Sequence, residues 1–222
     1  MLVILYDIHG NLPALEAVLT DAEGADAYLL GGDYGTPSPW PRETLDRLRT
    51  LEPATWIRGN GERWIFEPPA DRPEVGETYR EYMPGPLTED ELRWLYELPP
   101  HAELDGVLYV HGCVGRDDDS FAPEPQPEDE ARCGDLHDKT IVFGHSHLQF
   151  RRDGPHGNHL LNPGSVGMPL DGDIRAAWAA RNDGEFEFRR TEYDIERAAA
   201  GWRKLGGDFG MFAAQRIERG RD

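Results

Sequence analysis

The sequence LVILYDIHGN, residues 2–11, joins a short apolar run to a group of side chains that bind metal ions. Residues 2–6 are mostly aliphatic, and this predicts a short buried strand. Asp7 and His9 follow the strand directly and supply a carboxylate and an imidazole. Asn11 stands before an amphipathic segment, so we predict that it caps the helix that follows. A strand, a tight turn and a helix in this order predict the start of an α/β unit.

The same pattern, an apolar run that ends in a potential metal ligand, recurs along the chain. The further motifs are Gly32-Asp33, Gly59-Asn60, His111 after Val110, and Gly144-His145-Ser146-His147. With Asp7 and His9 they supply two carboxylates, one amide oxygen and four imidazoles, enough for two metal ions that share one carboxylate. Strands of one sheet end on a common edge, so these distant motifs can converge there. A dinuclear centre of this composition indicates hydrolysis of phosphate esters.

Strands that alternate with helices predict an α/β (α+β) fold whose first sheet is largely parallel. The predicted strands are 2–6, 27–30, 55–57, 108–110, 140–143 and 159–161, and the predicted helices are about 12–21, 42–50, 88–98 and 195–205. The runs 175–180 and 185–190, joined at Asn182-Asp183-Gly184, predict an antiparallel hairpin. We therefore predict a four-layer α-β-β-α sandwich, with two mixed sheets packed face to face and helices outside.

The length of 222 residues suits one domain over residues 1–222, with a small helical insertion at about 62–104. The alternation of strands and helices breaks at this insertion, which is rich in proline. Thr88 and Glu91 form a capping-box pattern there and predict the start of one of its helices. Gly206-Gly207 predicts the end of the helix at about 195–205.

The net charge of −19 repels polyanions, so we expect no extended nucleic acid as a partner but a small phosphate-ester substrate. No run approaches the roughly 18 apolar residues of a membrane helix, so we expect no membrane partner. The amino terminus enters a strand without a leader, so we expect a cytoplasmic protein. Cys113 and Cys133 are expected to be reduced thiols that bind no metal.

The ordered motifs resemble the calcineurin-like metallophosphoesterase superfamily, and within it the small prokaryotic phosphodiesterase branch. The resemblance extends from residue 1 to about 194 and rests on Asp7-Ile8-His9-Gly10-Asn11, Gly32-Asp33, Arg58-Gly59-Asn60, Val110-His111-Gly112 and Gly144-His145-Ser146-His147. It implies one metal ion held by Asp7, His9, Asp33 and His147, and a second held by Asp33, Asn60, His111 and His145. Asp33 would bridge the two ions, and a metal-bound hydroxide would attack phosphorus. Oxygen and imidazole ligands suit two divalent ions, manganese first, with iron, zinc, nickel or cobalt as alternatives.

The resemblance also assigns Asp33, Asn60 and Arg58 to catalysis. Arg58 resembles the arginine that grips substrate phosphate in the protein-phosphatase branch, although it could equally pair with a carboxylate. Asn11 could contact substrate or act only as a helix cap. Many relatives place a proton-donating histidine where this chain has Gly61, so the proton donor stays open, and Glu62 is a first replacement to examine.

We therefore predict metal-dependent hydrolysis of phosphate esters, with a phosphodiesterase as the first expectation. One alternative is a phosphatase that acts on phosphoproteins or dinucleoside polyphosphates. Another is a non-catalytic scaffold of the same fold, which the complete ligand set argues against. The sequence leaves the natural substrate and the oligomeric state open.

Overall fold

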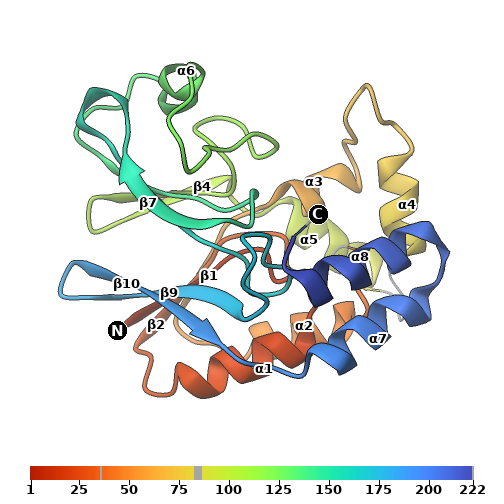
Figure 1. The fold of residues 1–222 in the computed structure, drawn as a ribbon. Coiled ribbons are helices and arrows are strands. Elements are labelled where there is room, and N and C mark those ends of the chain that lie inside the picture. The colour runs from red at the N-terminus through yellow and green to blue at the C-terminus, as the bar shows by residue number, and fades with distance from the viewer. Residues whose placement is uncertain (36, 83–86, 222) are drawn as a thin grey trace.

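Two five-stranded mixed sheets pack face to face in the computed structural model, which describes residues 1–35, 37–82 and 87–221 (Figure 1). The strands are β1 (Leu2–Leu5), β2 (Ala27–Leu30), β3 (Ala54–Trp56), β4 (His101–Leu104), β5 (Val107–Val110), β6 (Thr140–Val142), β7 (Gln149–Asp153), β8 (His159–Pro163), β9 (Ala176–Asn182) and β10 (Glu185–Thr191). The first sheet has the order β10-β9-β1-β2-β3, and the second has the order β4-β5-β6-β8-β7. The predicted pair of mixed sheets is confirmed.

Helices lie outside the two sheets and complete the predicted layers (Figure 1). They are α1 (Leu12–Asp21), α2 (Pro41–Leu48), α3 (Asn60–Trp64), α4 (Val75–Glu81), α5 (Glu89–Tyr96), α6 (Asp129–Cys133), α7 (Ile195–Leu205) and α8 (Gly207–Arg219), with a 3₁₀ turn at Pro155–Gly157. Apolar side chains of α1, α2 and α5 share one core with the outer face of the first sheet. The layer outside the second sheet is thin, because there a loop and the short helix α6 provide the cover.

The alternation along β1 shows how one strand serves two cores. Val3 and Leu5 point to the helices outside the sheet, whereas Ile4 and Tyr6 point to the space between the two sheets. Successive side chains of a strand face opposite sides, so a run that is apolar throughout is needed where both sides are buried. The continuous apolar run therefore belongs to a central strand, and β1 is the middle strand of its sheet.

The sequence did not predict the edge strands β4 and β7, the helices α3, α4 and α8, or the 3₁₀ turn. Both missed strands lie at an edge of the second sheet, and most of their residues are partly or fully exposed. Polar residues are accepted there, so these strands lack a continuous apolar signal. Gly206 ends α7 as predicted, with φ of 78°, but α8 begins at the next residue. The predicted end of the helix at this glycine pair is therefore confirmed, whereas the helix that follows it was not predicted.

The predicted insertion at about 62–104 contains α4, α5 and most of α3. Thr88 caps α5 as predicted, with its hydroxyl accepting from the backbone N–H of Glu91 at 3.3 Å. The insertion was predicted to be helical, but its last residues form the strand β4, which pairs with β5 in the second sheet. Residues 83–86 of the insertion lie outside the described part of the chain. None of the helices in the described residues is long and apolar enough to cross a membrane.

Candidate metal centre

The strands that precede the predicted ligands end on one side of the molecule. β1, β2 and β3 run parallel in the first sheet, and β5 and β6 run parallel in the second. The ligands stand directly after these strands: Asp7 and His9 after β1, Asp33 after β2, Asn60 after β3, His111 after β5, and His145 and His147 after β6. Hydrogen bonds continue between the loops, with the N–H of His9 donating to the Asp33 carbonyl at 2.8 Å. The structure therefore brings all seven predicted ligands together.

One group of ligand atoms forms around His9 and His147. Their Nε2 atoms lie 3.1 Å apart. Asp7 Oδ1 is 4.0 Å from the first of these nitrogens and 3.5 Å from the second. Asp33 Oδ2 lies 3.7 Å from His9 Nε2. These four side chains are the set that the sequence assigned to the first metal ion.

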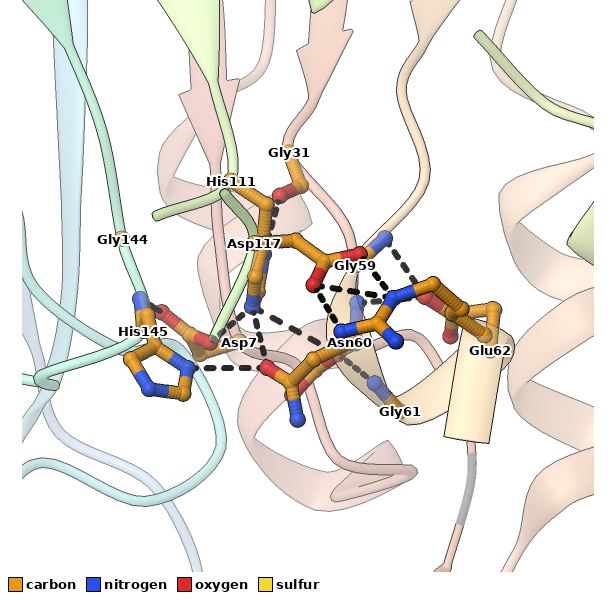
Figure 2. A network of polar contacts seen from close by, with 12 residues as sticks. Asp7, Gly31, Gly59, Asn60, Gly61, Glu62, His111, Asp117, Gly144 and His145 are labelled. Atoms are coloured by element: carbon orange, nitrogen blue, oxygen red, sulfur yellow. Dashed lines mark hydrogen bonds and ion pairs between the residues drawn. The ribbon is translucent and has the colours of Figure 1, made fainter. Parts of the chain in front are cut away.

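A second group forms around Asn60 (Figure 2). Its Oδ1 atom lies 3.0 Å from His111 Nε2 and 2.8 Å from His145 Nδ1. Asp33 Oδ1 is 3.6 Å from His111 Nε2. The two oxygens of Asp33 therefore face different imidazoles, one in each group. Asp33 thus lies near both groups, and so does Asp7, whose Oδ1 is 3.8 Å from His111 Nε2.

The backbone at the ligands is unusual. Five of the seven have positive φ values, between 46° and 67°: Asp7, His9, Asp33, His145 and His147. Non-glycine residues rarely adopt the left-handed region, and Asp and His are among those that enter it most readily. Each such residue costs on the order of 1 kcal/mol or more, so the surrounding contacts must hold it in place. Strain concentrated in this way indicates a functional site.

Glycines next to the ligands make room for this crowding. A Cβ atom at Gly59 would lie 2.2 Å from Asp33 Oδ1, and one at Gly144 would lie 2.6 Å from Asp7 Oδ2. Neither approach is tolerable, so the glycines of the motifs are required by the packing of the carboxylates.

Two imidazoles are oriented by backbone carbonyls. His111 Nδ1 lies 2.8 Å from the carbonyl oxygen of Gly31, and His147 Nδ1 lies 2.7 Å from that of Met168. An Nδ1–H that donates to a carbonyl fixes the ring and leaves Nε2 for a metal ion. In both residues Nε2 is the nitrogen that faces the carboxylates.

The carboxylates and imidazoles shift one another's protonation. Burial raises the pKa of Asp33 to about 7 even though the His111 imidazole opposes this rise. Burial alone would lower the pKa of His111, but the neighbouring Asp33 and Asp7 raise it to about 9. Burial and the nearby His147 lower the pKa of His9 to about 3. The carboxylates that raise the pKa of His111 would also favour a divalent cation bound beside them.

The residues fit a divalent cation. Asp7 Oδ1 is buried and has no hydrogen-bond partner among the described residues. Such an orphan acceptor is costly unless a cation or water completes it. Asp7, His9 and His147, and also Asp7, Asp33 and His111, place their ligand atoms within 4.8 Å of one another. Oxygen and imidazole donors suit manganese, iron, zinc, cobalt and nickel.

Glu62 has a structural role that the sequence did not predict. Its buried carboxylate accepts from the backbone N–H groups of Asp33 at 2.9 Å, Tyr34 at 2.8 Å and Gly59 at 2.9 Å. Burial raises its pKa, but both oxygens are occupied as acceptors, which argues against Glu62 as the proton donor in place of Gly61. The sequence offers one indication of this role, the position of Glu62 in the first turn of α3. Acidic side chains at that position commonly accept hydrogen bonds from free backbone N–H groups.

The end of β8 and the turn after it also support the ligand loops. The side-chain amide of Asn162 donates to the Gly144 carbonyl at 3.1 Å, and the Ser165 hydroxyl donates to the Asp7 carbonyl at 2.7 Å. Both side chains are buried beside the loops that carry the ligands. The sequence placed a turn at this position but assigned no role to these residues.

The two predicted substrate contacts have different environments. Arg58 donates to the Tyr96 carbonyl at 2.8 Å, and its guanidinium lies 5.1 Å over the Tyr96 ring. It lines a cavity of about 520 Å³ that reaches His111, so its phosphate-binding role stays a prediction. Asn11 is 0% exposed, accepts from the N–H of Ala14 at 3.2 Å and donates to the Gly167 carbonyl at 2.8 Å. Its capping role is confirmed, and this burial argues against a contact with substrate.

A second cavity of about 190 Å³ opens directly onto the ligands. Part of its lining, here called the ligand side, consists of five of the ligands: His9, Asp33, Asn60, His145 and His147. Most of the rest, here called the α8 side, is aromatic and comes from α3, α4, α7 and α8: Trp64, Tyr79, Trp202, Phe209, Phe212 and Arg216. The sequence predicted the ligand side only, because α8 was not recognised as a helix.

Comparison with known proteins agrees with this geometry. A family model described as "Calcineurin-like phosphoesterase superfamily domain" matches residues 1–182. An uncharacterized protein of Methanocaldococcus jannaschii is 27% identical over 224 residues, which cover 89% of this chain and 90% of that protein. A metallophosphoesterase from Sphaerobacter thermophilus is 25% identical, with a TM-score of 0.80, over 99% of this chain and 98% of that one. A hypothetical protein from Pyrococcus horikoshii is 20% identical, with a TM-score of 0.77 and 99% coverage of both chains.

Proposed function

From the premise that this chain belongs to the calcineurin-like phosphoesterase superfamily and is a hydrolase of phosphoric esters, we propose that it is a phosphodiesterase with a dinuclear metal centre. The family depends on divalent metal ions, and the described residues include groups that can hold one. A hydrolase of this family is an enzyme rather than the non-catalytic scaffold that the sequence left open.

The orientation of Asp33 supports two ions rather than one. Its Oδ2 lies 3.7 Å from His9 Nε2, and its Oδ1 lies 3.6 Å from His111 Nε2. Asn60 belongs only to the second group and contributes a neutral oxygen, which preserves positive charge for an anionic substrate. Two bound ions would supply the charge that polarises a phosphoryl oxygen and activates water.

The preference for diesters follows from the space beside the ligands. Gly61 carries no side chain, and its N–H donates to Asp33 Oδ1 at 2.7 Å. We infer that the missing side chain would admit an organic substituent that the imidazole of relatives would block. The aromatic side of the cavity offers apolar surface for such a substituent, which a monoester of a small alcohol would leave in water.

The substrate class and location complete the proposal. A net charge of −19 disfavours an extended polyanion, so we propose a small phosphate ester. Manganese is the proposed ion because the ligand set contains oxygen and imidazole donors and no thiolate. Cys113 and Cys133 are free and buried, which agrees with the proposed cytoplasmic location.

The test combines metal counting with two chromogenic substrates. Metal-free protein is titrated with Mn²⁺, and bound metal per chain is measured by elemental analysis. We expect two equivalents in the wild type and about one in Asn60→Ala, because Asn60 lies only in the second group. The manganese-loaded protein should hydrolyse bis(p-nitrophenyl) phosphate with a higher kcat/KM than p-nitrophenyl phosphate.

His159→Ala is the control, because this histidine is exposed and pairs with Asp153 away from the centre. It should retain both ions and full activity. A single equivalent of metal in the wild type would overturn the dinuclear centre, and a higher kcat/KM for the monoester would overturn the diesterase assignment.

A further inference from the structure

One face of α8 lines the cavity that contains the metal ligands. Phe209, Phe212, Ala213 and Arg216 are the α8 residues at this cavity. They are spaced i, i+3, i+4 and i+7, so they form one stripe along the helix. The stripe and the metal ligands therefore line the same cavity.

Packing holds α8 in this position. Figure 1 shows α8 beside α7, and Ala214 and Ile217 are buried in the core that the two helices share. At the end of α8 the Gly220 carbonyl accepts from the N–H of Gly172 at 2.8 Å. Near its start the Phe209 ring lies 5.9 Å from the ring of Trp202. These contacts fix the position of α8, and with it the position of the side chains of the stripe.

Arg216 brings positive charge to the cavity. Its side chain lines the same cavity as His9 and Asp33, so its positive charge lies beside the ligand group. A guanidinium opposite a cationic metal centre is repelled by it unless an anion lies between them. Its planar N–H groups are suited to a phosphoryl oxygen pair, which is such an anion.

Phe212 provides the apolar part of the same stripe. It is 46% exposed, and the guanidinium of Arg216 lies 4.4 Å from its ring centre. Trp64 and Tyr79 line the cavity from other helices. A large aromatic ring left partly in water beside aromatic walls can gain stability by stacking against a flat apolar group of a ligand.

We propose that α8 carries a substrate subsite, in which Arg216 binds a phosphoryl oxygen and Phe212 stacks on an aromatic substituent of the ester. The inference rests on the proposed function and names its substrate class, which is esters of phosphate with an aromatic organic group. Arg216 therefore determines affinity for the phosphoryl group, and Phe212 determines selectivity for the substituent.

The test uses two inhibitors that cannot be hydrolysed, phenylphosphonate and methylphosphonate. Their dissociation constants are measured by calorimetry on the manganese-loaded protein. The wild type should bind phenylphosphonate more tightly. Arg216→Ala should weaken both ligands by about tenfold, because it removes a charge-assisted hydrogen bond that both can form. Phe212→Ala should weaken phenylphosphonate by about fivefold and leave methylphosphonate unchanged, because only the phenyl ring stacks.

Two neighbouring residues provide matched controls. Met211 is 45% exposed, as Phe212 is, and Arg219 is exposed one turn beyond Arg216, but neither lines the cavity. Met211→Ala and Arg219→Ala should bind both phosphonates as the wild type does. Elemental analysis of Arg216→Ala should show wild-type metal content, which separates loss of anion binding from loss of metal.

The outcomes distinguish this subsite from the function on which it rests. Wild-type affinity for both phosphonates in Arg216→Ala and Phe212→Ala would overturn the subsite and leave the phosphodiesterase proposal intact. Equal binding of the two phosphonates by the wild type would overturn the aromatic preference. Failure of the wild type to bind either phosphonate would overturn the phosphate-binding centre together with the subsite.

Discussion

The two sides of the cavity at the metal ligands are built by different means. The ligand side consists of loops that follow parallel strands, and its side chains are positioned by strained backbone and buried hydrogen bonds. The α8 side consists of aromatic side chains on helices, which apolar packing holds in place. The ligand side is costly to build, whereas burial of the helical side contributes stability. This difference indicates that the loops supply chemistry and the helices supply both stability and selectivity.

The largest expected effect is a loss of activity without loss of the fold, caused by a substitution on the ligand side. Asp33→Asn should reduce kcat/KM by at least about a thousandfold, because it removes a charge that faces both ligand groups. The fold should persist, since the Asn oxygen can still accept from the N–H of Gly61. Phosphodiester hydrolysis, elemental analysis and circular dichroism check this result. Full activity with a normal metal content would show that Asp33 is not a shared ligand.

The helical side should respond in the opposite way. Trp202 is 1% exposed, belongs to the core that α7 and α8 share, and lines the cavity. Trp202→Ala should lower the free energy of unfolding by about 3 kcal/mol, because it leaves a large cavity in the core. Metal content at 25 °C should stay at the wild-type value. Urea denaturation and elemental analysis measure both quantities, and loss of metal from a folded variant would contradict the division between the two sides.

Glu62→Gln tests whether the ligand loops depend on a buried acceptor. Both oxygens of Glu62 accept from backbone N–H groups, whereas the amide of glutamine has one oxygen and one NH₂ group. In the variant at least one of these backbone N–H groups would point at the NH₂ group and lose its acceptor. We expect unfolding to require about 2 kcal/mol less than in the wild type, because a buried donor is left unsatisfied. Urea denaturation measures this change. The exposed Glu67→Gln serves as control and should leave the midpoint unchanged. An unaltered midpoint in Glu62→Gln would contradict the supporting role.

The smallest effect concerns the neighbouring cavity that contains Arg58. If Arg58 binds a phosphoryl oxygen, Arg58→Ala should reduce kcat/KM by a factor equivalent to about 1.5 kcal/mol without loss of metal. Steady-state kinetics on an aryl diester measure it. Comparison with Arg216→Ala shows which cavity receives the substrate. An unchanged kcat/KM in Arg58→Ala would leave Arg58 with its bond to Tyr96 as a structural residue.

Local sequence signals predicted most of the central elements. α1, β2 and α7 were placed with the bounds that the structure has, and β1 and β6 were one residue shorter than expected. In each element the apolar residues recur with the spacing of a helix or a strand, and a residue at one end marks its boundary. Asn11 before α1 is an example. The edge strands β4 and β7 lack this signal because their partly exposed faces accept polar residues.

The ligand side could be predicted because each ligand stands within a few residues of a strand end. A motif such as Gly144-His145-Ser146-His147 carries both the ligands and the glycine that the packing requires. Arg58 shows the limit of such reasoning, because its neighbours in sequence do not reveal that its guanidinium donates to Tyr96. Glu62 shows the same limit, since its three partners lie in two separate loops.

The sequence by itself determined the two sheets, the convergence of the ligands at strand ends and the metal chemistry of the donor set. These depend on local periodicity and on the rule that parallel strands end on one edge. Only the tertiary structure decided which residues face the ligands from the other side. α8 begins at Gly207, the second glycine of the pair that ends α7. Packing against α7 sets the direction of the stripe on α8. Packing between helices depends on contacts distant in sequence, so a one-dimensional pattern does not specify it.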